Sequence, residues 1–337
     1  MAAGQGFKTF ATGDVLTAAD TNGYLMQGVW VFADATARDA AVTSPEEGNT
    51  CYLKDTDNIM VYSGSAWVTK SGGAAAVNLL LNSNFAINQR AYVSAANLAS
   101  GSYGFDRWKS NYTNTTLTFT ASTQGQSLTI NASGGLQQVI EQGLVPAGTY
   151  TLSWTGTATA RVYNSGGTPP SYAASPVNFT ADGAANVVVE FTASAATKTL
   201  SKVQFNSGSN TTWSLATPTL QTELAACQRY FNANAMDSTT TGEVTLAIGL
   251  QPTTTQGCFT YPYPVQMRVK PTITITGLNL GDQAGFTTAA TLVSTAAGLQ
   301  TARIVASMAA NGAQYRPIFL QFPNTFTTAY VRFEAEL

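Results

Sequence analysis

Residues 78–90 read NLLLNSNFAINQR, and after a loop rich in Ser, Ala and Gly, residues 104–108 read GFDRW. Apolar runs of strand length stand between Asn, Ser and Gly residues, which is typical of short strands joined by turns. The closing Asp106, Arg107 and Trp108 place a carboxylate, a guanidinium and a large aromatic ring together. We interpret them as the end of a strand, with an ion pair beside a Trp of the hydrophobic core.

Composition favours a mainly β fold for the whole chain. Of the 337 residues, 10% are charged, 44% are hydrophobic and 10% are aromatic. Abundant Ala, Thr, Ser, Asn and Gly favour many short strands joined by polar turns over a helical enzyme fold. The apolar and aromatic residues are numerous enough to build cores, and the length suggests two or three domains rather than one.

Residues 1–28 are predicted to be a docking segment. Thr17 and Asp20 have the spacing of a capping box, which predicts a short helix that continues to Met26. The apolar side chains near the end of this segment are too few to bury themselves. We therefore expect them to pack against other chains.

Residues 29–70 are predicted to form a small α+β unit, with a helix from Ala35 to Val42 capped by Asp34 and then a meander of short strands. A unit of about forty residues is at the edge of independent stability, so self-association is expected. The small-residue segment 71–77 is interpreted as a linker.

Residues 78–220 are predicted to form a β-sandwich or jelly roll, because short strands follow one another at regular spacing between polar turns. The last of these expected strands covers Thr212–Leu220. Residues 221–242 are expected to be a helical linker to a second β domain at residues 243–337. The apolar residues that suggest this helix by their spacing are Leu220, Leu224, Cys227 and Phe231.

Several kinds of chemistry are disfavoured by the residues present. The chain has no His, which removes Ser-His-Asp and Cys-His nucleophile systems and His metal sites. The three cysteines, Cys51, Cys227 and Cys258, lack CxxC spacing and are expected to be buried free thiols. No phosphate-binding or dinucleotide-binding Gly motif is present, so we expect no metal and no cofactor.

The charge is nearly balanced but unevenly distributed. Residues 1–77 hold eight carboxylates against four Lys or Arg, a net charge of −4, and the remainder carries +2. Neither part has a basic stripe, so nucleic-acid binding is not expected. No apolar run approaches the ~20 residues of a membrane helix, and no signal peptide is evident, so membrane insertion is not expected.

Hydrolysis of a glycan would require two carboxylates that face each other across a sugar. The ten carboxylates after residue 77 are scattered, and Glu334 and Glu336 lie together on the last expected strand. We therefore expect a protein without enzymatic activity. A carboxylate site shared between subunits is the alternative.

Sugar binding requires aromatic faces flanked by amide, hydroxyl or charged groups, and the β domains supply both. The candidate glycan-binding residues are Tyr112, Tyr163, Tyr172 and Trp213. Core packing is the expected role of Trp108 and Trp154, and it is the competing interpretation for Trp213. Tyr163 and Tyr172 bracket a polar loop at 164–171, so they are expected to be the more exposed pair.

The chain resembles bacteriophage tail fibres and receptor-binding minor tail proteins that carry a carbohydrate-binding-like β-sandwich. An Asn-rich opening and a GFDRW stretch recur in that family, and both are present at 78–108. The resemblance continues in CQRYF at 227–231 and YPVQMR at 263–268. From GDVLTAAD at 13–20 through YSGSAW at 62–67, the chain is similar to the N-terminal part of phage minor tail proteins, which connects the fibre to the particle.

The resemblance implies a virion fibre or spike that attaches the phage particle to a host cell-surface polysaccharide without enzymatic activity. It further implies a homotrimer that is assembled in the host cytoplasm and bound to other virion proteins, of the tail, baseplate or capsid, through its N-terminus. Three alternatives stay open: a capsid-mounted head fibre of the same class, a polysaccharide depolymerase tailspike, and a purely structural baseplate or collar component.

Overall fold

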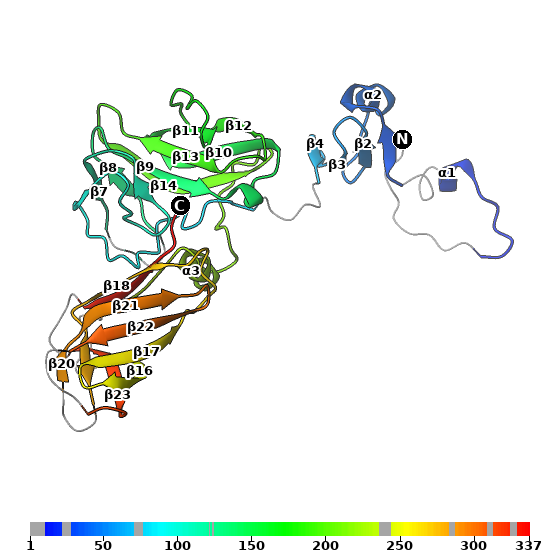
Figure 1. Ribbon diagram of the computed structural model, residues 1–337. Helices are drawn as coiled ribbons and strands as arrows, with labels where there is room; N and C mark the ends of the chain where they lie inside the picture. Colours follow the sequence, from blue (N-terminus) through cyan, green and yellow to red (C-terminus); the bar gives the residue numbers. More distant parts are fainter. Residues whose placement is uncertain are drawn as a thin grey trace. The chain divides into compact units, whose positions relative to one another are not determined.

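The chain has a mainly β fold, as its composition predicts, and Figure 1 shows how strands dominate over helices. In the computed structural model, the chain forms two compact units, Met1–Ala75 and Ala76–Leu337. No helix among the described residues is long and apolar enough to cross a membrane. The residues that the structure describes are 11–21, 28–70, 77–120, 122, 125–235, 244–282, 287–308, 313–323 and 329–337.

The first unit contains a four-stranded sheet in the order β1-β2-β3-β4, in which β1 is parallel to β2. Its elements are α1 (Ala18–Asp20), β1 (Trp30–Phe32), α2 (Ala35–Ala41), β2 (Thr50–Leu53), β3 (Asn58–Tyr62) and β4 (Trp67–Thr69). Asp34 caps α2 as expected, because its Oδ1 accepts a hydrogen bond from the Ala37 amide at 2.8 Å. The capping box of Thr17 and Asp20 is formed, whereas the expected continuation of that helix to Met26 lies outside the described residues.

The first β-sandwich of the second unit consists of a six-stranded and a four-stranded sheet. The six-stranded sheet has the order β12-β10-β14-β8-β7-β5, and the four-stranded sheet has the order β11-β13-β9-β6. The strands are β5 (Asn97–Leu98), β6 (Lys109–Ser110), β7 (Thr115–Thr118), β8 (Leu128–Ile130), β9 (Gly135–Ile140), β10 (Gly148–Gly156), β11 (Thr159–Asn164), β12 (Val177–Ala181), β13 (Val187–Thr192) and β14 (Lys198–Ser207). Side chains of both sheets, such as Phe191 of β13 and Phe205 of β14, share one buried core with Trp108.

The Asn-rich stretch that opens the second unit forms turns instead of the expected short strands, and its backbone is bonded to β14. The Leu79 amide donates to the Phe205 carbonyl at 2.8 Å, and the Val203 amide donates to the Ser83 carbonyl at 2.9 Å. Asn78 Nδ2 donates to the Val203 carbonyl at 2.8 Å, and Asn78 Oδ1 accepts from the Phe205 amide at 3.0 Å. The Asn side chain thus supplies bonds that a neighbouring strand would otherwise provide.

The GFDRW stretch comes immediately before the short strand β6, so our expectation that it ends a strand is wrong. Arg107 has a φ of 69°, a left-handed conformation that turns the chain just before β6. The core position of Trp108 is confirmed: the ring is fully buried, and its Nε1 donates to the Asn82 carbonyl at 3.0 Å. Arg107 does form an ion pair, but its partner is Glu336 and not the adjacent Asp106.

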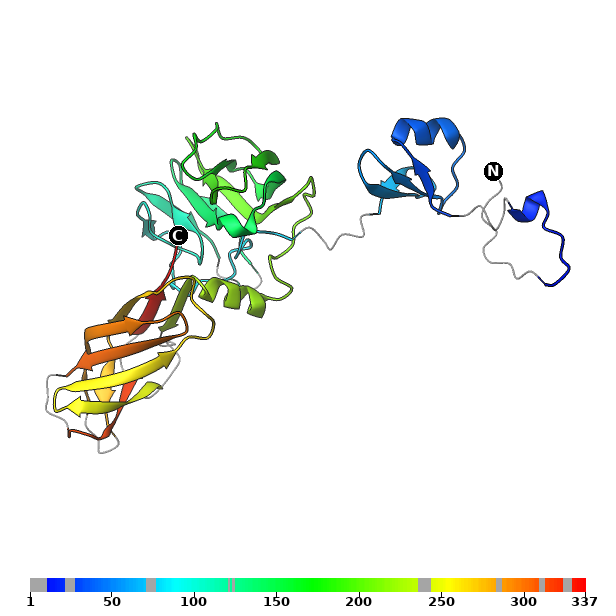
Figure 2. The same cartoon turned by 45° about the vertical axis from the view of Figure 1, so that its right-hand side comes forward.

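Helix α3 (Leu220–Gln228) leads from the first sandwich to the second, as Figure 2 shows. The second sandwich packs a three-stranded sheet, β15-β24-β18, against a seven-stranded sheet, β20-β19-β23-β16-β17-β22-β21. Its strands are β15 (Phe231–Ala235), β16 (Val244–Thr253), β17 (Gln256–Pro262), β18 (Thr272–Thr276), β19 (Asn279–Gly281), β20 (Thr287–Ala289), β21 (Thr291–Ala297), β22 (Thr301–Ser307), β23 (Pro317–Phe322) and β24 (Tyr330–Glu334). The expected pair of β-sandwich domains joined by a short helix is therefore confirmed.

The strand expected at Thr212–Leu220 is wrong. This segment contains no strand and runs directly into α3. Pro218 has no amide to donate to a sheet, and Thr219 acts as the N-cap of α3 by accepting a hydrogen bond from the Thr222 amide at 3.2 Å. The capping interaction of Thr219 therefore outweighs the β propensity of the threonines in this segment.

The expected helical position of Phe231 is also wrong. Helix α3 ends at Gln228, and Phe231 begins β15, where it pairs with Glu334 of β24. Pairing with a strand from the other end of the chain overrides the helical spacing of the apolar residues. The same pairing brings the last strand of the second sandwich next to the end of α3.

Candidate functional site

Two oppositely charged side chains lie next to each other on the outer face of the four-stranded sheet. Arg161 of β11 is directly opposite Glu190 of β13, and its Nε donates to Glu190 Oε2 at 2.6 Å. The next pair along these strands, Val162 and Val189, is buried in the core, so the charged pair faces away from it. Asn111 Nδ2 donates to the other oxygen of Glu190, and both carboxylate oxygens therefore accept hydrogen bonds.

Three tyrosines surround this pair, and we call Tyr112, Tyr163 and Tyr172 the tyrosine cluster. The ring centroids of Tyr172 and Tyr163 lie 4.3 Å and 5.6 Å from Arg161 Cζ. The Tyr112 hydroxyl is 3.3 Å from the Tyr172 hydroxyl and donates to Thr192 Oγ1 at 3.0 Å. All three tyrosines are half-buried. The structure thus brings three of the four candidate residues together.

Two phenols of the tyrosine cluster have a raised pKa because they are partly buried. Burial is the main cause that raises the pKa of Tyr163 and of Tyr172, and the hydrogen bond with Tyr112 raises the pKa of Tyr172 further. The hydrogen bond to Glu190 raises the pKa of Arg161. At neutral pH the site therefore offers ring faces and hydroxyl groups around a compensated charge pair.

One amide oxygen at this site is buried and accepts no hydrogen bond from any described residue. It is Oδ1 of Asn111, whose Nδ2 binds Glu190, whereas Asn164 alternates with Tyr163 on β11 and belongs to the opposite face of the strand. A buried acceptor left without a donor costs about 1–3 kcal/mol. This oxygen is covered by protein atoms, so Asn111 contributes to the site through its bond to Glu190.

Trp213 lies apart from the tyrosine cluster. It lines a cavity of about 340 Å³ with Trp154 of β10 and Lys202 of β14, both strands of the six-stranded sheet. Trp213 is half-buried, whereas Trp108 and Trp154 belong to the core of the sandwich. Core packing therefore accounts for Trp108 and Trp154, and Trp213 has one face on a cavity.

Sequence reasoning missed Arg161, Glu190 and Asn111 at this site. One signal was present, because the alternation of β11 places Arg161 and Tyr163 on the same outer face. The partner Glu190 follows only from the register of β11 against β13, which the sequence does not encode locally.

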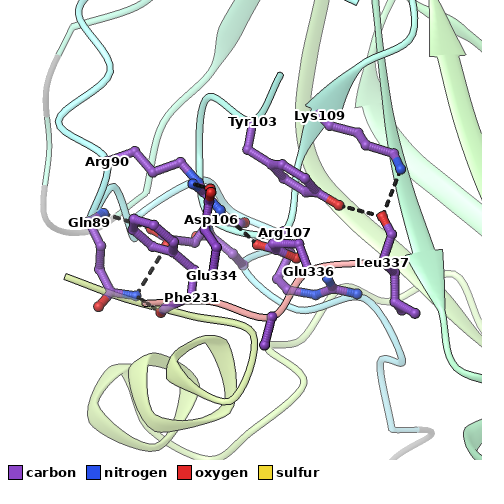
Figure 3. Close-up of polar contacts among 12 residues, drawn as sticks. Gln89, Arg90, Tyr103, Asp106, Arg107, Lys109, Phe231, Glu334, Glu336 and Leu337 are labelled. Carbon is purple, nitrogen blue, oxygen red and sulfur yellow. Dashed lines mark hydrogen bonds and ion pairs between the residues drawn. The ribbon is translucent and has the colours of Figure 1, made fainter. Parts of the chain in front are cut away.

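A second polar cluster joins the two sandwiches, and Figure 3 shows its contacts. Glu336 accepts hydrogen bonds from two guanidinium groups, from Arg107 Nη1 on Oε2 and from Arg90 Nη2 on Oε1 at 3.1 Å. Arg90 Nη1 also binds Glu334 Oε1 at 2.5 Å. We call Arg90, Arg107, Glu334 and Glu336 the interdomain clamp.

Aromatic rings and the last residue complete this junction. Arg90 Cζ lies 3.5 Å from the ring centroid of Phe231, and Arg107 Cζ lies 3.6 Å from that of Tyr230. The carbonyl oxygen of Leu337 accepts hydrogen bonds from the Tyr103 hydroxyl at 2.7 Å and from Lys109 Nζ at 2.8 Å. Burial raises the pKa of Tyr103 and lowers that of Lys109.

Asp106 belongs to the same junction. It accepts hydrogen bonds from the Gln89 amide at 2.7 Å and from Gln89 Nε2 at 3.1 Å, and Gln89 Nε2 also donates to the Phe231 carbonyl at 2.9 Å. Burial raises the pKa of Asp106 to about 7. A shifted carboxyl pKa can mark a catalytic group, but this carboxyl is fully buried and bound to Gln89. Asp106 thus orients Gln89, which makes the bond to Phe231 of the second sandwich.

No protein-family model matches the sequence, and no curated protein is significantly similar to it. Among solved structures, the chain is similar to the N-terminal CBM22-1–CBM22-2 tandem domain of a Paenibacillus barcinonensis protein, with 11% identity, a TM-score of 0.24, and coverage of 79% of this chain and 98% of that one. It is also similar to a Paenibacillus sp. cycloisomaltooligosaccharide glucanotransferase in complex with cycloisomaltoheptaose, with 10% identity, a TM-score of 0.20, and coverage of 75% and 46%. At such TM-scores these likenesses decide nothing about ligand or activity, and the two-sandwich fold follows from the chain's own strand pairing.

Proposed function

We propose that this chain binds a carbohydrate at the tyrosine cluster, on the outer face of the four-stranded sheet. The observation that carries the proposal is the arrangement of Tyr112, Tyr163 and Tyr172 around the Arg161–Glu190 pair. Phenol rings provide faces for the C–H groups of a sugar, while hydroxyl groups and a guanidinium provide hydrogen bonds in several directions. A polyhydroxylated ligand requires this combination.

The compensated charge pair favours a neutral glycan at this site. Because Glu190 neutralises Arg161, stacking and hydrogen bonds hold the ligand, and ionic attraction is secondary. Each aromatic contact contributes on the order of 1 kcal/mol, and three copies of the site on a homotrimer raise a modest affinity through avidity.

In its biological setting, we propose a non-enzymatic virion fibre or spike that attaches a phage to a host cell-surface polysaccharide. The protein is a homotrimer, assembled in the host cytoplasm, and residues 1–70 bind other virion proteins. Support comes from the family resemblance of residues 13–20, 62–67 and 78–108. The buried carboxylates of the second unit are bound to protein groups, which favours adhesion over hydrolysis.

Glycan microarrays with the full-length protein test this proposal. Tyr163→Ala and Tyr172→Ala are each expected to weaken binding to the recognised glycan about fivefold, the equivalent of one aromatic contact. Tyr315→Ala is the matched control, because Tyr315 is 72% exposed and lies in the second sandwich. Unchanged binding by well-folded Tyr163→Ala and Tyr172→Ala variants would contradict a site at the tyrosine cluster.

The same preparation separates adhesion from degradation. Incubation of the protein with the polysaccharide that it binds is expected to release no oligosaccharides and no new reducing ends. Release of sugar fragments would replace the adhesin with a depolymerase. Absence of binding to any glycan or host surface would favour a structural baseplate or collar component.

A further inference from the structure

The cavity beside Trp213 is separate from the tyrosine cluster and has a different chemical character. It has a volume of about 340 Å³ and is lined by strands β10 and β14 of the six-stranded sheet and by the segments around Ser175 and Trp213. This volume lies within the range of small-ligand sites in proteins. Sugar-sized ligands therefore fit this cavity.

A β-bulge places Lys202 at this cavity. Ser153 pairs with Gln204 and Thr155 pairs with Ser201, so that two residues of β14, including Lys202, stand opposite the single Trp154 of β10. Lys202 has a φ of 49°, the left-handed conformation that accompanies such a bulge. Bulges change the direction of a side chain, and here the ammonium group lies 5.9 Å from the ring centroid of Trp213.

The indole of Trp213 is fixed by bonds to the Asn-rich opening of the unit. Trp213 Nε1 donates to Ser83 Oγ at 3.2 Å. The next residue, Ser214, accepts from Asn78 Nδ2 at 2.9 Å and donates its amide to Gln204 Oε1 at 3.0 Å. The ring is therefore positioned in advance, and a ligand that stacks on it has little ordering to impose.

The lining combines this aromatic wall with one cation and several hydroxyl groups. Thr155, Ser175 and Thr211 supply hydroxyls, and no acidic residue lines the cavity among the residues that the structure describes. The net charge of the lining is therefore positive, in contrast to the neutral tyrosine cluster. A ligand for this cavity needs an apolar face, hydroxyl groups and a negative charge.

We infer that the Trp213–Lys202 cavity binds a sugar residue that carries a negatively charged group, either a carboxylate or a sulfate. The sugar ring stacks on Trp213, the anionic group pairs with Lys202, and the hydroxyl side chains bind ring substituents. This inference rests on the proposed carbohydrate binding and adds a second site, for an acidic sugar. The contacts of this second site are not shared with the tyrosine cluster.

Ligand-observed NMR titration of the full-length protein tests the inference with a matched pair of probes. Methyl β-D-glucuronide and methyl β-D-glucoside differ in a carboxylate against a hydroxymethyl group. At low salt we expect the glucuronide to bind about fivefold more tightly, which corresponds to one exposed ion pair. Glucose 6-sulfate, as the second anionic probe, distinguishes a preference for sulfate from one for carboxylate. Equal affinities of both anionic sugars and the glucoside would overturn the inference.

Variants then assign the effect to the cavity. Lys202→Gln is expected to remove the preference for the anionic sugars, whereas Lys198→Gln, on the same strand but outside the cavity, is expected to keep it. Trp213→Ala is expected to weaken all three sugars about fivefold or more, and Trp213→Phe to retain most binding as a check on folding. A preference that survives Lys202→Gln, or full competition by inorganic sulfate at equal concentration, would contradict an acidic-sugar site here.

The tyrosine-cluster variants keep this inference separable from the proposed function. Tyr172→Ala is expected to leave the binding of methyl β-D-glucuronide unchanged, because Tyr172 does not line this cavity. Loss of glucuronide binding in Tyr172→Ala would overturn the assignment to the Trp213–Lys202 cavity. If Tyr172→Ala loses binding to the glycan that the tyrosine cluster recognises but still binds methyl β-D-glucuronide, the inference is supported.

Discussion

Arg107 and Glu336 form an ion pair although 229 positions of sequence separate them, and their side chains are only 3% and 8% exposed. Removing two charges from water costs several kcal/mol per ion, so a buried pair is maintained only where further hydrogen bonds surround it. Arg107 Nη2 donates to the Val139 carbonyl at 2.6 Å, and Glu336 also binds Arg90. The pair therefore links the first sandwich to the segment that follows β24, the last strand of the second.

Replacement of Glu336 by Gln is expected to destabilise the second unit strongly. The change leaves the buried guanidinium of Arg107 without its carboxylate, which typically costs about 3–5 kcal/mol. Urea unfolding followed by Trp fluorescence measures the loss. Glu334→Gln is the matched control with an expected cost of about 1 kcal/mol or less, because Glu334 is 48% exposed. Equal effects of the two variants would show that the buried pair has no special weight.

The stability of the second unit is expected to fall as pH rises from about 4 to about 7. Burial raises the pKa of Asp106 from 3.8 to about 7, so the folded protein holds this proton more tightly than the unfolded chain does. Its stabilising contribution is complete at pH values below about 4 and is lost as pH rises through about 7.

Asp106→Asn isolates this contribution, because burial raises the pKa of Glu223 in the same direction and Glu223 is unchanged in the variant. Asn keeps one oxygen for the Gln89 amide. We expect the free energy of unfolding of Asp106→Asn, measured in urea between pH 4 and pH 8, to decline less steeply than that of the wild type. Parallel pH profiles of the two proteins would rule out Asp106 as a source of the decline.

The full-length protein is expected to be a homotrimer at micromolar concentration. The N-terminal unit is small, and Val29, just before β1, and Val31, within β1, are 53% and 58% exposed, so packing against other copies would bury apolar surface. Sedimentation equilibrium gives the mass directly. A concentration-independent monomer mass would count against the fibre assignment.

Deletion of residues 1–70 is expected to abolish incorporation into virions and to leave host-surface binding intact. The deleted residues fall within the first compact unit, whereas the tyrosine cluster lies in the second. Incorporation is measured on purified particles, and binding is measured by adsorption of the truncated protein to host cells. A truncated protein that stays folded and trimeric but no longer binds cells would reverse the assignment of the two parts.

Local features of the sequence were sufficient to predict much of the fold. Asp34 and the capping box at Thr17 identify helix starts, because the side chain that caps a helix is adjacent to it in sequence. Alternation between Thr149 and Thr155 identifies β10 and places Trp154 in the core. Such features depend on neighbours within a few residues, and they could be predicted for that reason.

The features that could not be predicted depend on pairing between distant segments. Nothing near Arg107 specifies Glu336 over Asp106 as its partner, and nothing near Arg161 specifies Glu190. The tyrosine cluster was predicted in part, since Tyr163 and Tyr172 flank one loop, but Tyr112 lies between β6 and β7 and meets Tyr172 only through the tertiary fold. Trp213 was grouped with the tyrosines because residue type alone does not distinguish the two sheets.

The position of β24 between β15 and β18 has a mechanical consequence for the second unit. Strand β15 follows α3, which connects the sandwiches covalently, while the residues after β24 hold the first sandwich through Arg107, Tyr103 and Lys109. The second sandwich is thus held to the first at two places, through α3 before β15 and through the residues after β24. A pulling force between the sandwiches is shared by the peptide chain and the interdomain clamp, and bending about α3 alone requires the clamp to break first.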